Sequence, residues 1–231
     1  MSDSLKHRLE NLQARIEQAC ARSGRDPSSL TLLAVSKTFP AQAIREAVDL
    51  GLTAFGENRM QEVREKAPLL EDLSIRWVLI GHLQTNKAKD AARWVDEVQS
   101  VDRLALAQAL DRRLREEGRT LDILVQVKTS PEPSKSGLAP DQLLTLLDQL
   151  HQYPTLKVKG LMTLAVNSED EARVRDCFRL LRQLRDDAVR AGFPEVARLS
   201  MGMTGDFEWA IEEGATDIRI GSALFGHRAY P

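Results

Sequence analysis

Lys37 occupies a position from which it could do chemistry at the end of a β-strand. It ends the apolar run LLAVSK, which begins at Leu32. Alternation along a strand places Leu33, Val35 and Lys37 on one face. If that face is buried, desolvation favours the neutral amine, which can attack an aldehyde to form a Schiff base. The alternative is a lysine that turns outward into solvent where the strand ends.

Arg219 is the second candidate, in the run DIRIG near the C-terminus. Alternation separates it from the isoleucines on either side, and one of the two faces is the interior of the sheet. A buried arginine is costly unless it is paired. Arg219 therefore either points inward, where it would disfavour protonation of Lys37 by repulsion, or lies outside and pairs with an acid such as Asp217.

Glycine-rich segments follow the last two β-rich runs of the chain. They are SMGMTGD over 200–206 and GSALFG over 221–226. In α/β barrels, the loops after strands seven and eight frequently bind phosphate with help from a helix N-terminus. Backbone N–H groups and the hydroxyls of Ser200, Thr204 and Ser222 could bind a phosphate there.

Further polar residues follow other runs. Asn58, in FGEN, could orient a cofactor or simply cap the next helix. His82, in IGHLQTNK, is a candidate acid–base group, although a single histidine in a polar turn is weak evidence. Lys135, in PSKSG, could attract phosphate, although most loop lysines are only solvated.

The elements that must position these residues alternate along the chain. A helix over 4–23 comes first, with apolar residues at helical spacing. The β-rich runs begin near Leu32, Thr53, Arg76, Glu97, Leu121, Lys157, Arg198 and Asp217. Helices are predicted over 41–50, 103–117, 141–150, 168–191 and 206–213. Ser168 and Glu171 are expected to form a capping box at the start of the fourth of these helices.

Eight such units predict parallel strands with crossover helices, closed into a single (β/α)₈ TIM barrel with an extra N-terminal helix. The alternative is an open doubly wound sheet. It is disfavoured because no Gly-x-Gly-x-x-Gly turn follows the first strand. No linker or break in composition divides the chain, so we expect one domain over residues 1–231.

Composition excludes several classes of protein. The 231 residues are 42% hydrophobic and 29% charged, with a formal net charge of −2, so nothing suggests nucleic-acid binding. Cys20 and Cys177 fall at apolar helical positions and are expected to be free thiols in a reducing compartment. No Cys/His cluster has metal-ligand spacing, and no signal peptide or membrane span is evident. We therefore expect a cytoplasmic protein without membrane contact.

Seven motifs together carry a family resemblance. Between residues 34 and 226 they are, in order, AVSKTFP, FGEN, IGHLQTNK, SKSG, GLMTL, SMGMTGD and RIGSALFG. Together they closely resemble the pyridoxal 5′-phosphate (PLP) homeostasis protein family, over almost the whole chain. That family is similar in fold to the N-terminal domain of alanine racemase, with PLP bound to the lysine after the first strand.

The resemblance implies that Lys37 holds PLP as a Schiff base and that Arg219 lies near the pyridine nitrogen. It also implies a phosphate site after the last two strands. The cofactor-binding residues that we expect are Lys37, Asn58, Ser200, Thr204, Arg219, Gly221 and Ser222.

The sequence departs from the family at a few positions. Val78 stands where a histidine is common, and Arg59-Met60 stands where Tyr-Val is frequent. Thr204 replaces a common serine but keeps the hydroxyl. These differences affect the packing around the cofactor ring and leave the lysine unaffected.

An arginine at the pyridine nitrogen argues against catalysis. It donates a hydrogen bond and leaves that nitrogen unprotonated, which weakens the electron sink of PLP. Alanine racemase has, in addition, a tyrosine base from a further domain, and we expect no such domain here because ten residues follow Gly221. Tyr153 precedes the sixth strand, at the wrong end of the barrel, and Tyr230, near the C-terminus, has no predicted place in it.

We therefore expect a PLP carrier that buffers the cofactor and delivers it to apo-enzymes, without substantial catalytic activity. Free amino acids are possible further ligands, and a monomer is expected. The first alternative is a PLP-dependent amino-acid racemase or related enzyme. The second is an aldolase-type barrel that forms a Schiff base directly with its substrate.

Overall fold

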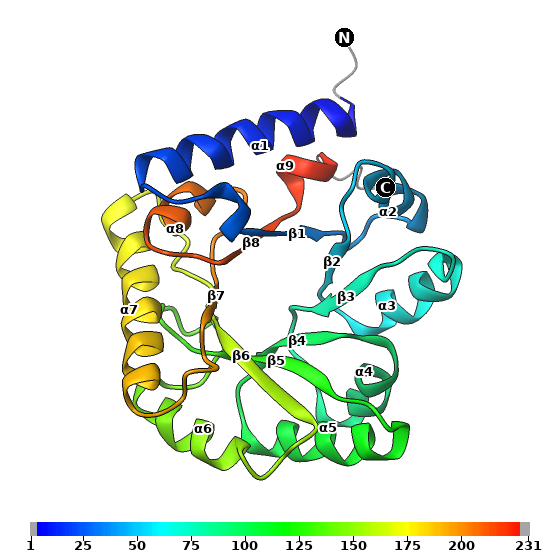
Figure 1. Ribbon diagram of the computed structural model, residues 1–231, viewed down its shortest axis with the longest axis vertical. Coiled ribbons are helices and arrows are strands. Elements are labelled where there is room, and N and C mark those ends of the chain that lie inside the picture. Colours follow the sequence, from blue (N-terminus) through cyan, green and yellow to red (C-terminus); the bar gives the residue numbers. More distant parts are fainter. Residues whose placement is uncertain (1–3, 227–231) are drawn as a thin grey trace.

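The computed structural model of the protein describes residues 4–226 and shows a closed barrel of eight parallel strands, as predicted (Figure 1). Each strand pairs with its neighbour in the sequence, and β8 closes the ring against β1. The strands are β1 (Thr31–Val35), β2 (Ala54–Glu57), β3 (Arg76–Leu79), β4 (Glu97–Val101), β5 (Leu121–Gln126), β6 (Leu156–Met162), β7 (Arg198–Ser200) and β8 (Asp217–Ile220).

Helices surround the ring of strands, and α1 lies outside it beside α8 and α9 (Figure 1). The α-helices are α1 (Leu5–Arg22), α2 (Ala41–Asp49), α3 (Met60–Lys66), α4 (Ala88–Trp94), α5 (Leu104–Glu117), α6 (Leu143–Leu150), α7 (Glu171–Arg190), α8 (Phe207–Glu212) and α9 (Ser222–Phe225). The 3₁₀ turns are η1 (Pro27–Ser29), η2 (Ala67–Leu70), η3 (Thr85–Lys87) and η4 (Pro140–Gln142). No helix in the described part of the chain is both long and apolar enough to cross a membrane.

Two features of the helices differ from the sequence prediction. The short helices α3, α4 and α9 were given no predicted bounds, although Asn58 was considered as a cap for a helix after the second strand, because none of the three shows a clear apolar stripe. The capping box was wrong. Asp170 is the N-cap of α7 and accepts hydrogen bonds from the backbone N–H groups of Ala172 and Arg173. The Ser168 hydroxyl instead accepts a hydrogen bond from the backbone N–H of Asp170 itself.

Most of the hydrophobic core lies between the barrel and its helices. Strand residues such as Phe55, Val98 and Ile218 belong to this outer core. A smaller set of buried apolar side chains fills the barrel interior and is not part of this outer core. These residues are Leu33, Val35, Val78, Leu124 and Met162. Polar and charged residues occupy the remaining inward positions. The interior of this barrel is therefore unusually polar.

Charged residues close the end of the barrel where the strands begin, which we call the N-terminal mouth. Glu97 is completely buried and accepts hydrogen bonds from Arg76 and Arg198, each at 2.6 Å. Arg198 also pairs with Asp217, and Arg76 with Asp122 at 3.2 Å. Burial lowers the pKa of Arg198, but its hydrogen bonds with Asp217 and Glu97 outweigh this effect and raise the pKa overall.

Candidate functional site

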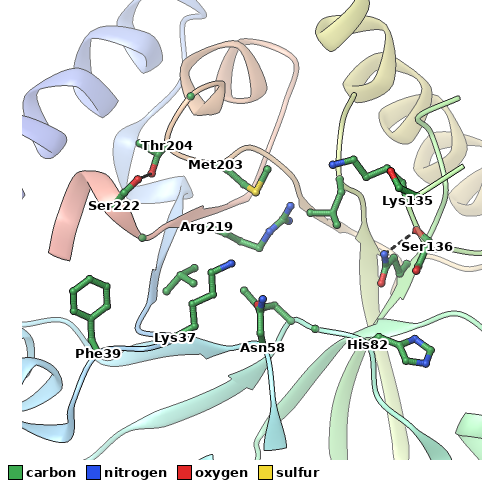
Figure 2. A pocket seen from close by; sticks show the side chains of 18 of the residues that line it. Lys37, Phe39, Asn58, His82, Lys135, Ser136, Met203, Thr204, Arg219 and Ser222 are labelled. Atoms are coloured by element: carbon green, nitrogen blue, oxygen red, sulfur yellow. Dashed lines mark hydrogen bonds between the residues drawn. The ribbon is translucent and has the colours of Figure 1, made fainter. Parts of the chain in front are cut away.

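A cavity of about 850 Å³ opens at the other end of the barrel, where the strands finish. We call this end the C-terminal mouth; in TIM barrels it is where active sites form. The structure brings six of the seven predicted cofactor-binding residues to the cavity wall: Lys37, Asn58, Thr204, Arg219, Gly221 and Ser222. Figure 2 shows the side chains of Lys37 and Arg219 directed into the same space.

The backbone around Lys37 is held in an uncommon conformation. Thr38 has φ +68°, in the left-handed region that residues other than glycine seldom adopt. Its backbone N–H donates a 2.6 Å hydrogen bond to the carboxylate of Glu62, and the carbonyl of Ser36 accepts one from Lys66 at 3.0 Å. Side chains of α3 thus fix the residues on both sides of Lys37.

A buried ion cluster under this turn was missed by the sequence analysis. The Lys66 ammonium donates to Glu57 at 2.8 Å and to Glu62 at 3.0 Å, and the Ser36 hydroxyl donates to Glu57 at 2.7 Å. Burial raises the pKa of Glu57 to about 7, although Lys66 acts to lower it. Glu57 Oε2 is buried without a hydrogen-bond partner. The i, i+4 spacing of Glu62 and Lys66 was a visible signal, but the bounds of their helix were not predicted.

Arg219 lies inside the barrel and is only 3% exposed. Its guanidinium donates to the Ser200 hydroxyl and to the carbonyl oxygen of Thr163, each at 2.7 Å. The alternative pairing with Asp217 is not found, since that carboxylate pairs with Arg198 instead. Burial lowers the pKa of Arg219 to about 10, so the group stays cationic at neutral pH.

The segments after β7 and β8 meet at one side of the cavity. The hydroxyls of Thr204 and Ser222 lie 3.3 Å apart, and the backbone N–H of Ala223 donates to the Thr204 hydroxyl at 3.4 Å (Figure 2). Gly202 shapes the first segment. It has φ +92°, and an added Cβ would lie 2.6 Å from the Cβ of Ala210. A glycine is therefore required where the chain turns toward the cavity.

Ser200 is the predicted site residue that the structure does not bring to the cavity wall. It is completely buried, and its hydroxyl is shared between Arg219 and Gln99. Asn58 faces the cavity and does not cap α3, whose N-cap is Arg59. The Asn58 side chain is therefore available to a ligand.

Lys135, on the loop after β5, lies on the cavity wall opposite Thr204 and Ser222 (Figure 2). The side-chain amide of Gln126 donates a 2.9 Å hydrogen bond to the carbonyl of Ser136 and so ties this loop to the end of β5. His82 also lines the cavity, but it is exposed and its ring is directed away from Lys37 (Figure 2).

Other predicted features can also be placed. Tyr153 is partly buried beside the hydrophobic core, just before β6, and Tyr230 lies outside the described residues. Cys20 and Cys177 are both free and buried. No cluster of three or more metal-binding side chains occurs within residues 4–226.

The fold has clear counterparts among known proteins. A solved alanine racemase from Clostridium difficile superposes with a TM-score of 0.77 and covers 99% of this chain and 58% of its own. At 14% identity this likeness shows the shared barrel fold alone. The family model described as the alanine racemase N-terminal domain matches residues 3–229.

Curated relatives identify a particular branch of these barrels. A pyridoxal phosphate homeostasis protein of Aquifex aeolicus is 43% identical, over 96% of this chain and 98% of its own. The structure of PipY from Synechococcus elongatus with PLP bound has 40% identity and a TM-score of 0.82, and covers 92% of this chain and 100% of its own. The chain belongs to the alanine racemase N-terminal domain family, in the branch of the pyridoxal phosphate homeostasis proteins.

Proposed function

We propose that this chain binds PLP at the C-terminal mouth and serves PLP homeostasis by holding the cofactor and delivering it to apo-enzymes. One observation carries the proposal. Lys37, Arg219 and Lys135 face one cavity, and no carboxylate is found among the described residues that line it. A ligand that is both an aldehyde and a phosphate monoester matches a lysine amine beside cationic side chains. The residues present therefore fit PLP.

Each part of the cavity has a place in this proposal. Lys37 is the amine that holds the aldehyde, and Arg219 faces the ring nitrogen. Thr204, Gly221 and Ser222 bind the phosphate through hydroxyls and backbone N–H groups. Asn58 orients the ring. Ser200, expected at the phosphate, is assigned no contact with it because its hydroxyl is already engaged below Arg219.

The same geometry supports binding without turnover. PLP supplies an electron-withdrawing ring when its nitrogen is protonated. Arg219 has a pKa of about 10, so it keeps its proton at neutral pH and donates only a hydrogen bond. A racemase also needs a proton donor on the second face of the substrate. The described lining residues include no tyrosine, and the His82 ring is directed away from Lys37 (Figure 2).

The experiment that tests covalent binding is the visible absorption of the purified protein. Lys37→Ala should abolish the cofactor band, and peptide mapping after borohydride reduction should find the pyridoxyl group on Lys37. Lys87→Ala, at an exposed lysine of η3 outside this cavity, is the matched control and should keep the band. A label found only on another lysine would contradict the proposal.

Turnover tests the choice between carrier and racemase. We expect free amino acids to enter the cavity without substantial α-proton exchange, racemisation, transamination or decarboxylation. Deuterium exchange at the α-carbon and chiral chromatography measure the first two reactions. Rates of roughly 1 s⁻¹ or faster would establish an enzyme instead.

The remaining proposals concern the setting of the protein. We propose that residues 1–231 are one PLP-binding domain that acts as a cytoplasmic monomer. The barrel supports a single unit, because its strands run from Thr31 to Ile220 and close on each other. Sedimentation of the loaded protein tests the monomer. Reactivation of a PLP-free apo-enzyme by the loaded protein, faster than by the PLP it spontaneously releases, tests delivery.

A further inference from the structure

A chain of hydrogen bonds runs through the barrel interior from Arg219 toward the N-terminal mouth. Arg219 donates to the Ser200 hydroxyl at 2.7 Å, and that hydroxyl donates to Gln99 Oε1 at 2.6 Å. Gln99 Nε2 then donates to Glu97 Oε1 at 2.6 Å. Gln99 is 1% exposed, and Ser200 and Glu97 are fully buried. No water can substitute for these partners without entering the barrel.

Every link of the chain has a fixed direction. Glu97 as a carboxylate can only accept, which turns the amide N–H of Gln99 toward it and leaves the amide oxygen facing Ser200. The Ser200 hydroxyl must then donate its proton to Gln99, so its lone pairs face Arg219. Reversing the amide would set two oxygens 2.6 Å apart at Glu97. Hydrogen bonds aligned in this way polarise and strengthen one another.

The chain matters because Arg219 forms no ion pair with any residue in the described range 4–226. It is held inside the barrel by two neutral acceptors, the Ser200 hydroxyl and the Thr163 carbonyl. A guanidinium has five N–H donors in one plane, so two inward hydrogen bonds fix that plane and leave other donors for the cavity. A single inward bond would leave the plane free to rotate about it.

We propose that Ser200 and Gln99 are positioning residues, which aim the Arg219 guanidinium at the ring nitrogen of the bound cofactor. Glu97, held by Arg76 and Arg198, anchors the far end of the chain. This inference rests on the proposed PLP site and adds to it a role for two residues that do not touch the ligand. It also reassigns Ser200 from the phosphate group to the ring nitrogen.

The test compares PLP with its 1-deaza analogue, in which carbon replaces the ring nitrogen while aldehyde and phosphate remain. Native protein should bind PLP at least about tenfold more tightly than the 1-deaza analogue. This ratio of affinities is the size expected of a hydrogen bond to a charged group. Ser200→Ala and Gln99→Met, which removes the amide at nearly equal length, should bring this ratio close to one. Ser200→Thr, which keeps the hydroxyl, should preserve it.

The ratio separates positioning from other roles. A loss of packing, or a phosphate contact by Ser200, would weaken both ligands equally and leave the ratio unchanged, which would overturn the inference. Ser130→Ala, at another buried serine whose hydroxyl contacts Glu132, is the matched control and should not alter the ratio. If native protein binds neither ligand, the proposed function fails; if it binds both but does not discriminate, only the positioning inference fails.

A second readout needs no ligand. In the apo-protein, the Arg219 side-chain N–H signals should exchange slowly with solvent, and rotation about the Cζ–Nε bond should be restricted. Nuclear magnetic resonance of ¹⁵N-labelled protein measures both. Ser200→Ala and Gln99→Met should each speed exchange and rotation several-fold, while Ser130→Ala should not. Unchanged signals in both variants would also overturn the inference.

Discussion

At the N-terminal mouth, Glu97 forms ion pairs with Arg76 and Arg198, and Arg198 also pairs with Asp217. At the C-terminal mouth, Lys37 and Arg219 face a cavity where the described lining residues include no acid. Both regions place charge inside the same barrel, and on β8 Asp217 of one region lies two residues from Arg219 of the other. At the N-terminal mouth both signs of charge meet in ion pairs, whereas the charged groups among the described residues that line the C-terminal cavity are all cations.

The difference separates what stabilises the barrel from what prepares it for a ligand. Buried charges need partners, and those at the N-terminal mouth have them within the chain. At the C-terminal mouth, the cations among the described residues of the cavity wall can bind an anion, such as a phosphate. The chain of hydrogen bonds from Arg219 to Glu97 links the two regions, so the ion pairs of the N-terminal mouth support an arginine of the C-terminal mouth.

The largest expected effect comes from removing the Glu97 carboxylate at the N-terminal mouth. Glu97→Gln removes the carboxylate that Arg76 and Arg198 share, and removing one partner of a buried pair costs about 3–5 kcal/mol in free energy of unfolding. The loss should lie near the lower end of that range, because Arg198 keeps Asp217 and Arg76 keeps Asp122. Urea denaturation measures this loss. Glu208→Gln is the control, because Glu208 pairs with Arg15 at the surface and such pairs contribute at most about 1 kcal/mol. Equal losses in the two variants would contradict the comparison.

Two buried glutamates sharpen the comparison through pH. Glu97 has two arginine partners. Glu57, which lies under the turn at Lys37, has Lys66 as a cationic partner and shares it with Glu62. Burial raises the pKa of Glu57 from its ordinary 4.5 to about 7. Between these values the unfolded state loses the proton while the folded state keeps it. The free energy of unfolding should therefore fall as pH rises from about 4.5 through 7, by up to about 3 kcal/mol.

Glu57→Gln should remove this fall, as measured by urea denaturation between pH 5 and 8. The matched control is Glu62→Gln, at the other carboxylate on Lys66. Hydrogen bonds from Thr38 and Lys66 outweigh the burial of Glu62 and lower its pKa, so its contribution is present at high pH and lost on acidification. The fall should persist in that variant but be somewhat smaller, because the Glu62 charge contributes to raising the pKa of Glu57. A profile unchanged by Glu57→Gln would mean that another group titrates.

The barrel was predictable because its signals are local and repeated. Strand-like runs alternated with helical patterns, and the glycines and prolines between them marked the boundaries. The short helices α3 and α4 escaped because tertiary packing, and not an apolar stripe of their own, fixes them. Asp170 was missed as an N-cap because Ser168 offered an equally plausible one two residues earlier.

The site was predictable where strand parity and position sufficed. Lys37 and Arg219 point inward, as alternation allowed. The role of Ser200 could not be read from its motif, because its partners Gln99 and Arg219 come from other strands. In EVQSV, alternation does set Glu97 and Gln99 on one face, and this was the available signal of a polar interior. Pairing within that interior depends on barrel register, which the sequence does not show.

A smaller effect tests the proposed phosphate position at the C-terminal mouth. Gly221→Val should weaken PLP retention by about tenfold, or about 1.4 kcal/mol, because the side chain crowds the proposed phosphate position. An added Cβ there comes no closer than 3.4 Å to the Val35 carbonyl oxygen, so the first side-chain atom has room. Pyridoxal, which lacks the phosphate, should bind the native protein and the variant equally. Tight binding of pyridoxal to the native protein would contradict the phosphate site.

The smallest expected effect concerns His82, a cavity residue that adds no fixed charge to the comparison. It is exposed, and its ring is directed away from Lys37 (Figure 2). His82→Ala should therefore change PLP retention by about twofold or less, equivalent to roughly 0.4 kcal/mol. Equilibrium dialysis measures PLP retention by this variant and by Lys135→Ala. Lys135→Ala should weaken retention more, because Lys135 supplies positive charge to the same cavity. A larger loss from His82→Ala than from Lys135→Ala would show that the C-terminal mouth recognises PLP through a neutral contact more than through its cations.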